Sequence, residues 1–248
     1  SHRQTGIADR TEPAPPARAP LWLRAAAIDE RNYQRVARRN DRLFVVLLLA
    51  QWLAAVGFSA CVGTSLPTNA ARGPHFHLGL ALWLGALCAL APAAMVWRFP
   101  AHALTRQVIA LGQMGFSCLL LRLTGGRIEL TVHVYSSLFL LAHYRDWRVL
   151  VTASMVTAID HFAQGSVASA GAYGVSHPAF LRTLEHVGWV AFSDVFLIAM
   201  CVRARAEMRE AGLREASTEE VTEREARTRI EADRDAELVA VVTEASRA

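Results

Sequence analysis

The chain alternates between long apolar stretches and short segments that contain arginine, and this pattern predicts membrane-spanning helices. A helix needs roughly 20 apolar residues to cross about 30 Å of hydrocarbon, with a lower limit near 17. Six stretches approach this length with their flanks, although the fourth and fifth are short and carry polar residues. The sequence therefore predicts an all-α protein, a polytopic bundle of about six transmembrane helices. The predicted spans are 43–63, 76–97, 104–123, 128–144, 147–165 and 185–203.

The arginines predict which side of the membrane each connection faces. The chain has no lysine, and arginines crowd the segment just before the first span. Two more lie at each of the second-to-third and fourth-to-fifth connections when the first residues of the following span are included, and two lie just after the sixth span, whereas the other three connections have one each. Because positive charge favours the cytoplasmic side, we expect a membrane protein with both ends in the cytoplasm. The arginines flank spans and do not form one basic face, so nucleic acid is not an expected partner.

Composition divides the chain into three regions. Residues 1–41 are predicted to be a disordered, proline-containing lead followed by a basic juxtamembrane helix. Residues 42–203 form the transmembrane module, and residues 204–248 form a cytoplasmic helical connector. The juxtamembrane helix is either a charged linker or a helix on the inner membrane surface. In the second case its lipid-facing side chains are Leu21, Trp22, Leu23, Ile28 and Tyr33.

The connector is predicted to be a long solvated helix. Glu220 precedes Arg224 by four residues, the order that stabilises a helix, and the same spacing recurs along the segment. An imperfect apolar seam predicts a parallel coiled coil, and hence a homodimer. We expect a further domain to follow this helix. The seam residues are Leu213, Val221, Ile230 and Leu238.

Histidines and carboxylates lie beside or inside four of the predicted spans. In the six-span topology all of them fall at the outer face, and ionisable groups in a bilayer are costly, so a shared depth suggests a shared function. Glu129 and His133 are four residues apart and share one helix face. Asp194 lies about 12 Å deeper on the sixth span. Besides His75 and His77, the candidate ligand-binding or sensing residues are Glu129, His133, Asp160, His161, Glu185, His186 and Asp194.

Three kinds of chemistry fit this set. Imidazole and carboxylate bind transition metals, here Zn, Cu or Fe, and imidazole also binds haem. A proton-linked or small-ligand site is the second, and structural hydrogen bonding between helices is the third. Adjacent Asp160 and His161 cannot point the same way, since neighbours differ by about 100°, so each such pair offers one ligand and one supporting partner. The candidate metal ligands are His77, Glu129, His133, His161 and His186.

Motifs of soluble enzymes are absent from the sequence. It contains no GxxxxGK[ST], no GxGxxG after a strand and no GxSxG, which leaves no nucleotide-binding or hydrolase signature. The cysteines lie singly within apolar spans, so we interpret them as small core residues and expect neither a disulfide nor a thiolate metal site. They are Cys61, Cys88, Cys118 and Cys201.

Several local strings together resemble the N-terminal transmembrane input module of bacterial sensor histidine kinases, including hybrid kinases. GGRIE at 125–129 and YRDWRVL at 144–150 are followed in order by DHF at 160–162 and LEHVGWV at 184–190. The likeness extends from about residue 30 to about residue 210.

One position departs from the pattern of that module. Thr131 stands where the module has the first histidine of a pair, whereas Glu129 and His133 match it. The change leaves one imidazole fewer for a complete metal shell.

The resemblance implies that the chain is the sensory input module of a two-component system. A signal at the His and carboxylate site near the periplasmic face would pass along the sixth helix to downstream kinase domains and a response regulator. The chain itself would hold no catalytic domain, and its parent would be a protein histidine kinase. Two alternatives use the same residues: a membrane metal- or haem-binding redox protein or enzyme, and a proton-coupled carrier with Asp194 as its central group.

Overall fold

The structure is a computed structural model, and it describes residues 19–62, 74–124, 131–167 and 179–246. These residues form helices and contain no strand, which confirms the all-α prediction. The disordered lead predicted for residues 1–18 lies outside the described residues. The helices are α1 (Leu21–Val62), α2 (Pro74–Arg98), α3 (Ala103–Leu123), α4 (Thr131–Ala142), α5 (Trp147–Val167) and α6 (Ala179–Ala245).

The chain divides into two compact units. The larger unit, from Tyr33 to Glu207, is a helix bundle, and the smaller one combines the chain before Tyr33 with the chain from Met208 onwards. Both boundaries fall inside continuous helices, α1 and α6. Composition predicted boundaries at 41/42 and 203/204. These positions lie several residues from the boundaries of the compact units, because composition reflects charge whereas the units are defined by packing.

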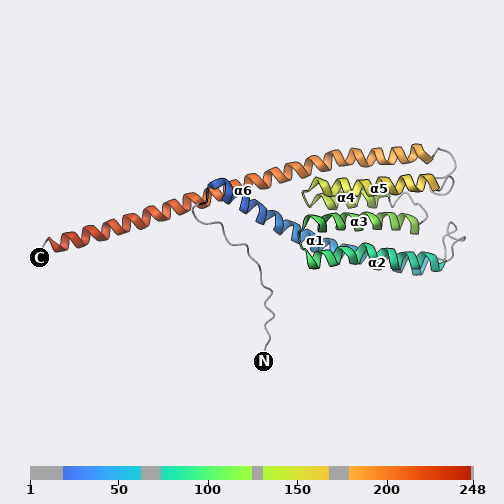
Figure 1. Cartoon of the computed structure of the whole chain (residues 1–248), viewed down its shortest axis with the longest axis horizontal. Helices are drawn as coiled ribbons and strands as arrows, with labels where there is room; N and C mark the ends of the chain where they lie inside the picture. The colour runs from blue at the N-terminus through green and yellow to red at the C-terminus, as the bar shows by residue number, and fades with distance from the viewer. Residues whose placement is uncertain (1–18, 63–73, 125–130, 168–178, 247–248) are drawn as a thin grey trace, which may run out of the picture. The chain divides into compact units, whose positions relative to one another are not determined.

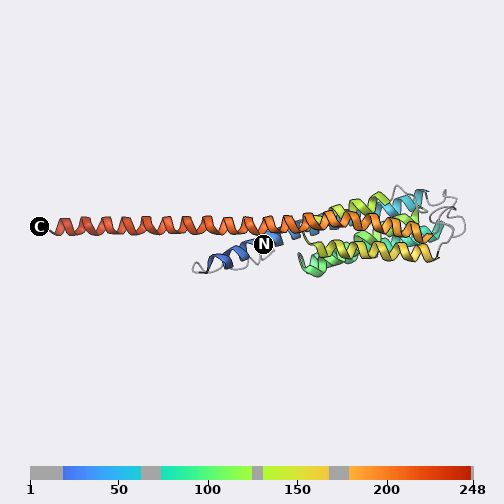
Figure 2. The ribbon, with the colours of Figure 1, turned by 90° about the horizontal axis from the view of Figure 1, so that it is seen from above.

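Within the bundle, α3 is central. It packs against α2, α4 and α5, and α4 also packs against α5. These four helices lie side by side in both views and alternate in direction (Figures 1 and 2). At Gly112 a Cβ atom would lie 2.5 Å from the carbonyl oxygen of Cys88, so glycine is what permits the close approach of α3 to α2.

Four helices are long and apolar enough to cross a membrane: α1, α2, α3 and α6. Large apolar side chains such as Trp83 on α2 and Val46 on α1 are exposed, as expected of surfaces that face lipid. Together these features indicate a membrane protein. The described part of α4 has only 12 residues, and α5 does not meet the same criterion of length and hydropathy, so the count of six spans stays a prediction.

One end of the bundle is held by a set of hydrogen bonds that we call the turn network: Asp41, Ala101 and Tyr144. Asp41 lies just before the predicted first span and is completely buried. Its Oδ2 accepts the Ala101 N–H at 2.6 Å, and its Oδ1 accepts the Tyr144 hydroxyl at 2.8 Å. Ala101 has a φ of 62°, a strained value for alanine, in the turn between α2 and α3. Asp41 therefore joins α1 to the α2–α3 turn and to the end of α4.

Two of the side chains predicted to face lipid do not do so. Ile28 is buried against Ala25 and Ala216 within the smaller unit. Tyr33 is buried in the bundle, where its ring lies 4.9 Å from the Arg106 guanidinium and 4.1 Å from that of Arg205. These two apolar side chains were expected to contact lipid, and in the structure other parts of the protein cover them. Leu21, Trp22 and Leu23 are exposed, as the prediction requires.

Candidate functional site

His133 lies at the start of α4 and connects three helices. Its Nε2 is 3.1 Å from the side-chain Nε2 of Gln51 on α1, and its Nδ1 is 2.9 Å from the Ser117 hydroxyl on α3. The Ser117 hydroxyl itself donates to the Gln113 carbonyl at 3.3 Å, so Ser117 links His133 to the backbone of α3. Both ring nitrogens of His133 thus have hydrogen-bond partners, one on α1 and one on α3.

His161 on α5 and His186 on α6 form a stacked pair. Their ring centroids are 4.4 Å apart, and the planes differ by only 7°. His161 is buried, and its Nδ1 lies 2.9 Å from the Thr157 carbonyl oxygen, to which it donates. The stack joins α5 to α6 at this end of the bundle, where the Thr183 hydroxyl on α6 also donates to the His161 backbone carbonyl at 3.5 Å.

The far side of the His186 ring meets a third helix. Tyr135 of α4 presents its ring edge-on to His186 at 6.0 Å between centroids. The Nε2 of His186 is buried and has no hydrogen-bond partner in the described structure. His186 therefore packs against the rings of His161 and Tyr135, while its Nε2 forms no hydrogen bond in the described structure.

A small cavity lies beside the stacked pair. It has room for about one water molecule, near the lower limit for a hydrated site. Ser117 lines this cavity and also bonds His133, so it connects the two. The residues that line it are Ser117, Cys118, Leu121, Val134, Thr157, Asp160, His161 and His186. We call Gln51, Ser117, His133, His161 and His186 the histidine layer.

Asp160 is paired with an arginine. Its Oδ1 accepts from Arg122 Nη2 on α3 at 2.6 Å, and the carboxylate is nearly buried whereas the Arg122 side chain is half exposed. His161, its neighbour in sequence, turns toward His186 instead. The predicted division between neighbouring residues, in which each points a different way, holds for this pair.

The other candidate side chains that the structure describes do not join the layer. Glu185 is exposed, while its neighbour His186 points inward. Asp194 is buried deeper along α6, where its Oδ2 accepts the Ser154 hydroxyl and its Oδ1 has no described partner. His77 on α2 is buried with both ring nitrogens unpartnered. Glu129 lies outside the described residues, and so does the side chain of His75.

The arrangement does not fit the predicted metal shell. Among the described residues no group of three or more His, Cys, Asp or Glu side chains lies close enough to hold a metal ion. Stacked rings present their faces to each other, so His161 and His186 do not direct nitrogen lone pairs at a common point. Both nitrogens of His133 already have partners. The described residues therefore contain no metal-binding cluster, and the metal and haem sites stay predictions.

Sequence reasoning missed the residues that connect the histidines. Gln51 and Ser117 bond His133, Tyr135 packs on His186, and Arg122 neutralises Asp160. A signal for two of them was present, because Gln51 interrupts the apolar run of the first span and Ser117 follows Gln113 by one helical turn in the third. Polar residues inside an apolar span must find partners within the protein.

No family model, curated protein or solved structure matches the chain. The resemblance to the input module of sensor histidine kinases therefore stays a prediction. The geometry of the histidine layer is the physical basis for proposing a function.

Proposed function

We propose that this chain is the membrane-embedded sensory input module of a two-component sensor histidine kinase. It would lie in the bacterial inner membrane with six spans, with both termini in the cytoplasm and the histidine layer near the periplasmic face. Its partners would be the lipid bilayer, a second copy, and the downstream kinase domains with their response regulator.

The observation that carries the proposal is the stacked contact between His161 and His186. The stack joins α5 to α6 at the level where the Thr183 hydroxyl also donates to the His161 backbone carbonyl at 3.5 Å, and α6 continues without a break from Ala179 to Ala245. A change at the layer that separates or reorients the two rings would alter the α5–α6 contact. Because α6 is one helix, such a change would move the segment beyond the bundle as well.

The layer has the properties expected of a ligand-responsive site. A ligand can shift an equilibrium only by its different affinity for two arrangements, and unused polar atoms offer such a difference. His186 Nε2 is buried and unpartnered beside a cavity of about one water molecule. A small polar ligand or a water rearrangement at this point would form bonds that the described arrangement lacks. This is a reason to favour sensing over purely structural pairing.

The site is tested by replacing two of its histidines. In membranes that contain the parent kinase, the double variant His133→Ala/His161→Ala should express normally and lose the change in autophosphorylation that wild type shows across a panel of pH values and small solutes. His143→Ala is the matched control, since His143 is exposed just beyond the end of the helix that carries His133. A double variant that responds like wild type would remove the layer from the proposal.

The family assignment has its own test. The coding sequence after Ala248 should specify a phosphoacceptor domain and an ATP-binding domain. A different kind of domain there would contradict the kinase part of the proposal and leave the geometry of the layer untouched.

A further inference from the structure

The smaller unit contains a tight pairing between the start of α1 and the part of α6 that follows the bundle. At Gly212 a Cβ atom would lie 3.2 Å from the Ala25 carbonyl oxygen and 3.3 Å from the Asp29 amide nitrogen, so the two helices meet backbone to backbone. Ala216, one turn further along α6, is completely buried against Ala25 and Ile28. Small residues on both helices make this approach possible.

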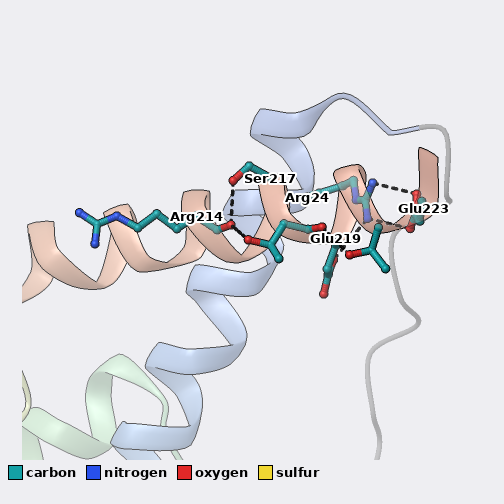
Figure 3. Close-up of polar contacts among 7 residues, drawn as sticks. Arg24, Arg214, Ser217, Glu219 and Glu223 are labelled. Atoms are coloured by element: carbon teal, nitrogen blue, oxygen red, sulfur yellow. Dashed lines mark hydrogen bonds and ion pairs between the residues drawn. The ribbon is translucent and has the colours of Figure 1, made fainter. Parts of the chain in front are cut away.

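Charged side chains close the pairing at its end. Arg24 reaches across to α6, where its guanidinium binds both oxygens of Glu223, at 2.9 and 3.2 Å, and one oxygen of Glu219 at 3.3 Å (Figure 3). The Arg24 side chain is almost fully covered, whereas both glutamates remain about half exposed. At the other end Asn32 donates to Glu215 at 3.5 Å. The contacts on α1 recur every four residues, which places them on one helix face.

These contacts matter because the rest of the tail has no packing of its own. In the described part of α6 from Met208 onwards, the buried positions are Met208, Gly212 and Ala216. Every described side chain from 224 to 246 is exposed. A helix without tertiary packing is only marginally stable in water. Residues 21–32 therefore supply the packing that this chain provides for the tail.

We propose that residues 21–32 form a clasp that docks on residues 208–223 of α6 and restrains the tail until it is released. The claim that the clasp restrains the tail rests on the proposed function, in which α6 carries the signal. A helix that turns or slides at Gly212 has no spare space against α1, so movement of the tail requires the clasp to open. The ion pairs are its releasable part, since their glutamates are in contact with solvent and salt screens them.

Hydrogen–deuterium exchange on the full chain, in nanodiscs that hold one copy each, tests the clasp. Backbone amides of 21–32 and 208–223 should be protected in wild type. In Arg24→Glu both segments should exchange together and roughly threefold to tenfold faster, the range for loss of a partly exposed charge pair. The triple variant Arg24→Glu/Glu219→Arg/Glu223→Arg should restore protection.

Matched controls separate the pairing from general charge effects. Arg39→Glu makes the same change at an exposed position on the same helix, and Glu225→Arg makes the reverse change at an exposed position next to the clasp. Both should leave exchange as in wild type. Unchanged exchange in Arg24→Glu, or failure of the triple variant to restore protection, would overturn the clasp. Protection that arises only with two copies per nanodisc would overturn its intramolecular form.

A nitroxide label at Leu238→Cys tests restraint of the tail. The label should become more mobile in Arg24→Glu and return to its wild-type mobility in the triple variant. If exchange shows that the clasp is open while the mobility of the label is unchanged, the proposed restraint of the tail would be overturned. These measurements need no stimulus, so their failure is distinct from failure of the sensory proposal, which depends on the response of the histidine variants.

Discussion

The histidine layer and the turn network both bury polar side chains between helices, yet they differ in how completely those groups are bonded. In the turn network each oxygen of Asp41 has its own donor. In the histidine layer, His186 Nε2 is buried with no described partner. An unmade buried hydrogen bond costs about 1–3 kcal/mol. The first region thus has a donor for each carboxylate oxygen, and the second has a buried ring nitrogen without a protein partner among the described residues.

The largest effect on stability should follow from Asp41→Ala. The substitution leaves the Ala101 amide and the Tyr144 hydroxyl without an acceptor, at a cost of about 2–5 kcal/mol in the free energy of unfolding. Thermal unfolding in detergent would measure it, with Asp235→Ala in the exposed tail as the control. A loss below about 0.5 kcal/mol would show that the network does not hold this end of the bundle.

Two substitutions within the histidine layer should separate the effect of a side chain on stability from its effect on the signal response. His133→Ala removes the bonds to Gln51 and Ser117 and should lower the free energy of unfolding by about 1–3 kcal/mol. His186→Phe keeps a flat ring against His161 and removes the unpartnered nitrogen, so it should unfold like wild type or resist unfolding slightly more. The same denaturation assay compares them, and autophosphorylation of the parent kinase should be unresponsive in both.

If His186→Phe proved as destabilising as His133→Ala, the contrast within the layer would disappear. His186 would then act chiefly as a structural residue.

The smallest expected effect is a pH dependence at the turn network. Burial raises the pKa of Asp41 above its ordinary 3.8, although hydrogen bonds from Ala101 and Tyr144 oppose this. Since the folded state then holds the proton more tightly than the unfolded state, this carboxyl contributes stability at low pH that is lost as pH rises through its folded pKa. Wild type should therefore gain stability relative to Asp41→Asn as pH falls from 7 toward 4. Unfolding midpoints of both proteins across that range would reveal the trend, and the opposite slope would refute it.

The sequence anticipated much of the candidate site but not its connections. The alternation of spans placed His133, His161 and His186 at the same end of the bundle, and the structure brings them into one continuous layer. It could not show that His161 stacks on His186, or that Ser117 bridges the cavity and His133. Those contacts depend on the rotation and offset of one helix against another, which sequence spacing within a single helix does not encode.

The metal prediction illustrates the same limit. Residue type and depth were sufficient to suggest ligands, but coordination requires lone pairs to converge within about 2 Å of one point. In the structure the rings of His161 and His186 turn their faces toward each other, and Glu129 lies outside the described residues, so the metal site stays a prediction.

By itself the sequence determined that the chain folds as helices and that several of them are apolar enough to cross a bilayer. It also indicated that the helix of the sixth predicted span continues far beyond its apolar part. These properties follow from local composition and from the 3.6-residue period of a helix. Only the tertiary structure decided that Ile28 meets Ala216, that Arg24 binds Glu219 and Glu223, and that the histidines join in one layer. The physical reason is that periodicity defines a helix face, whereas the neighbour of that face is chosen by packing between segments far apart in the chain.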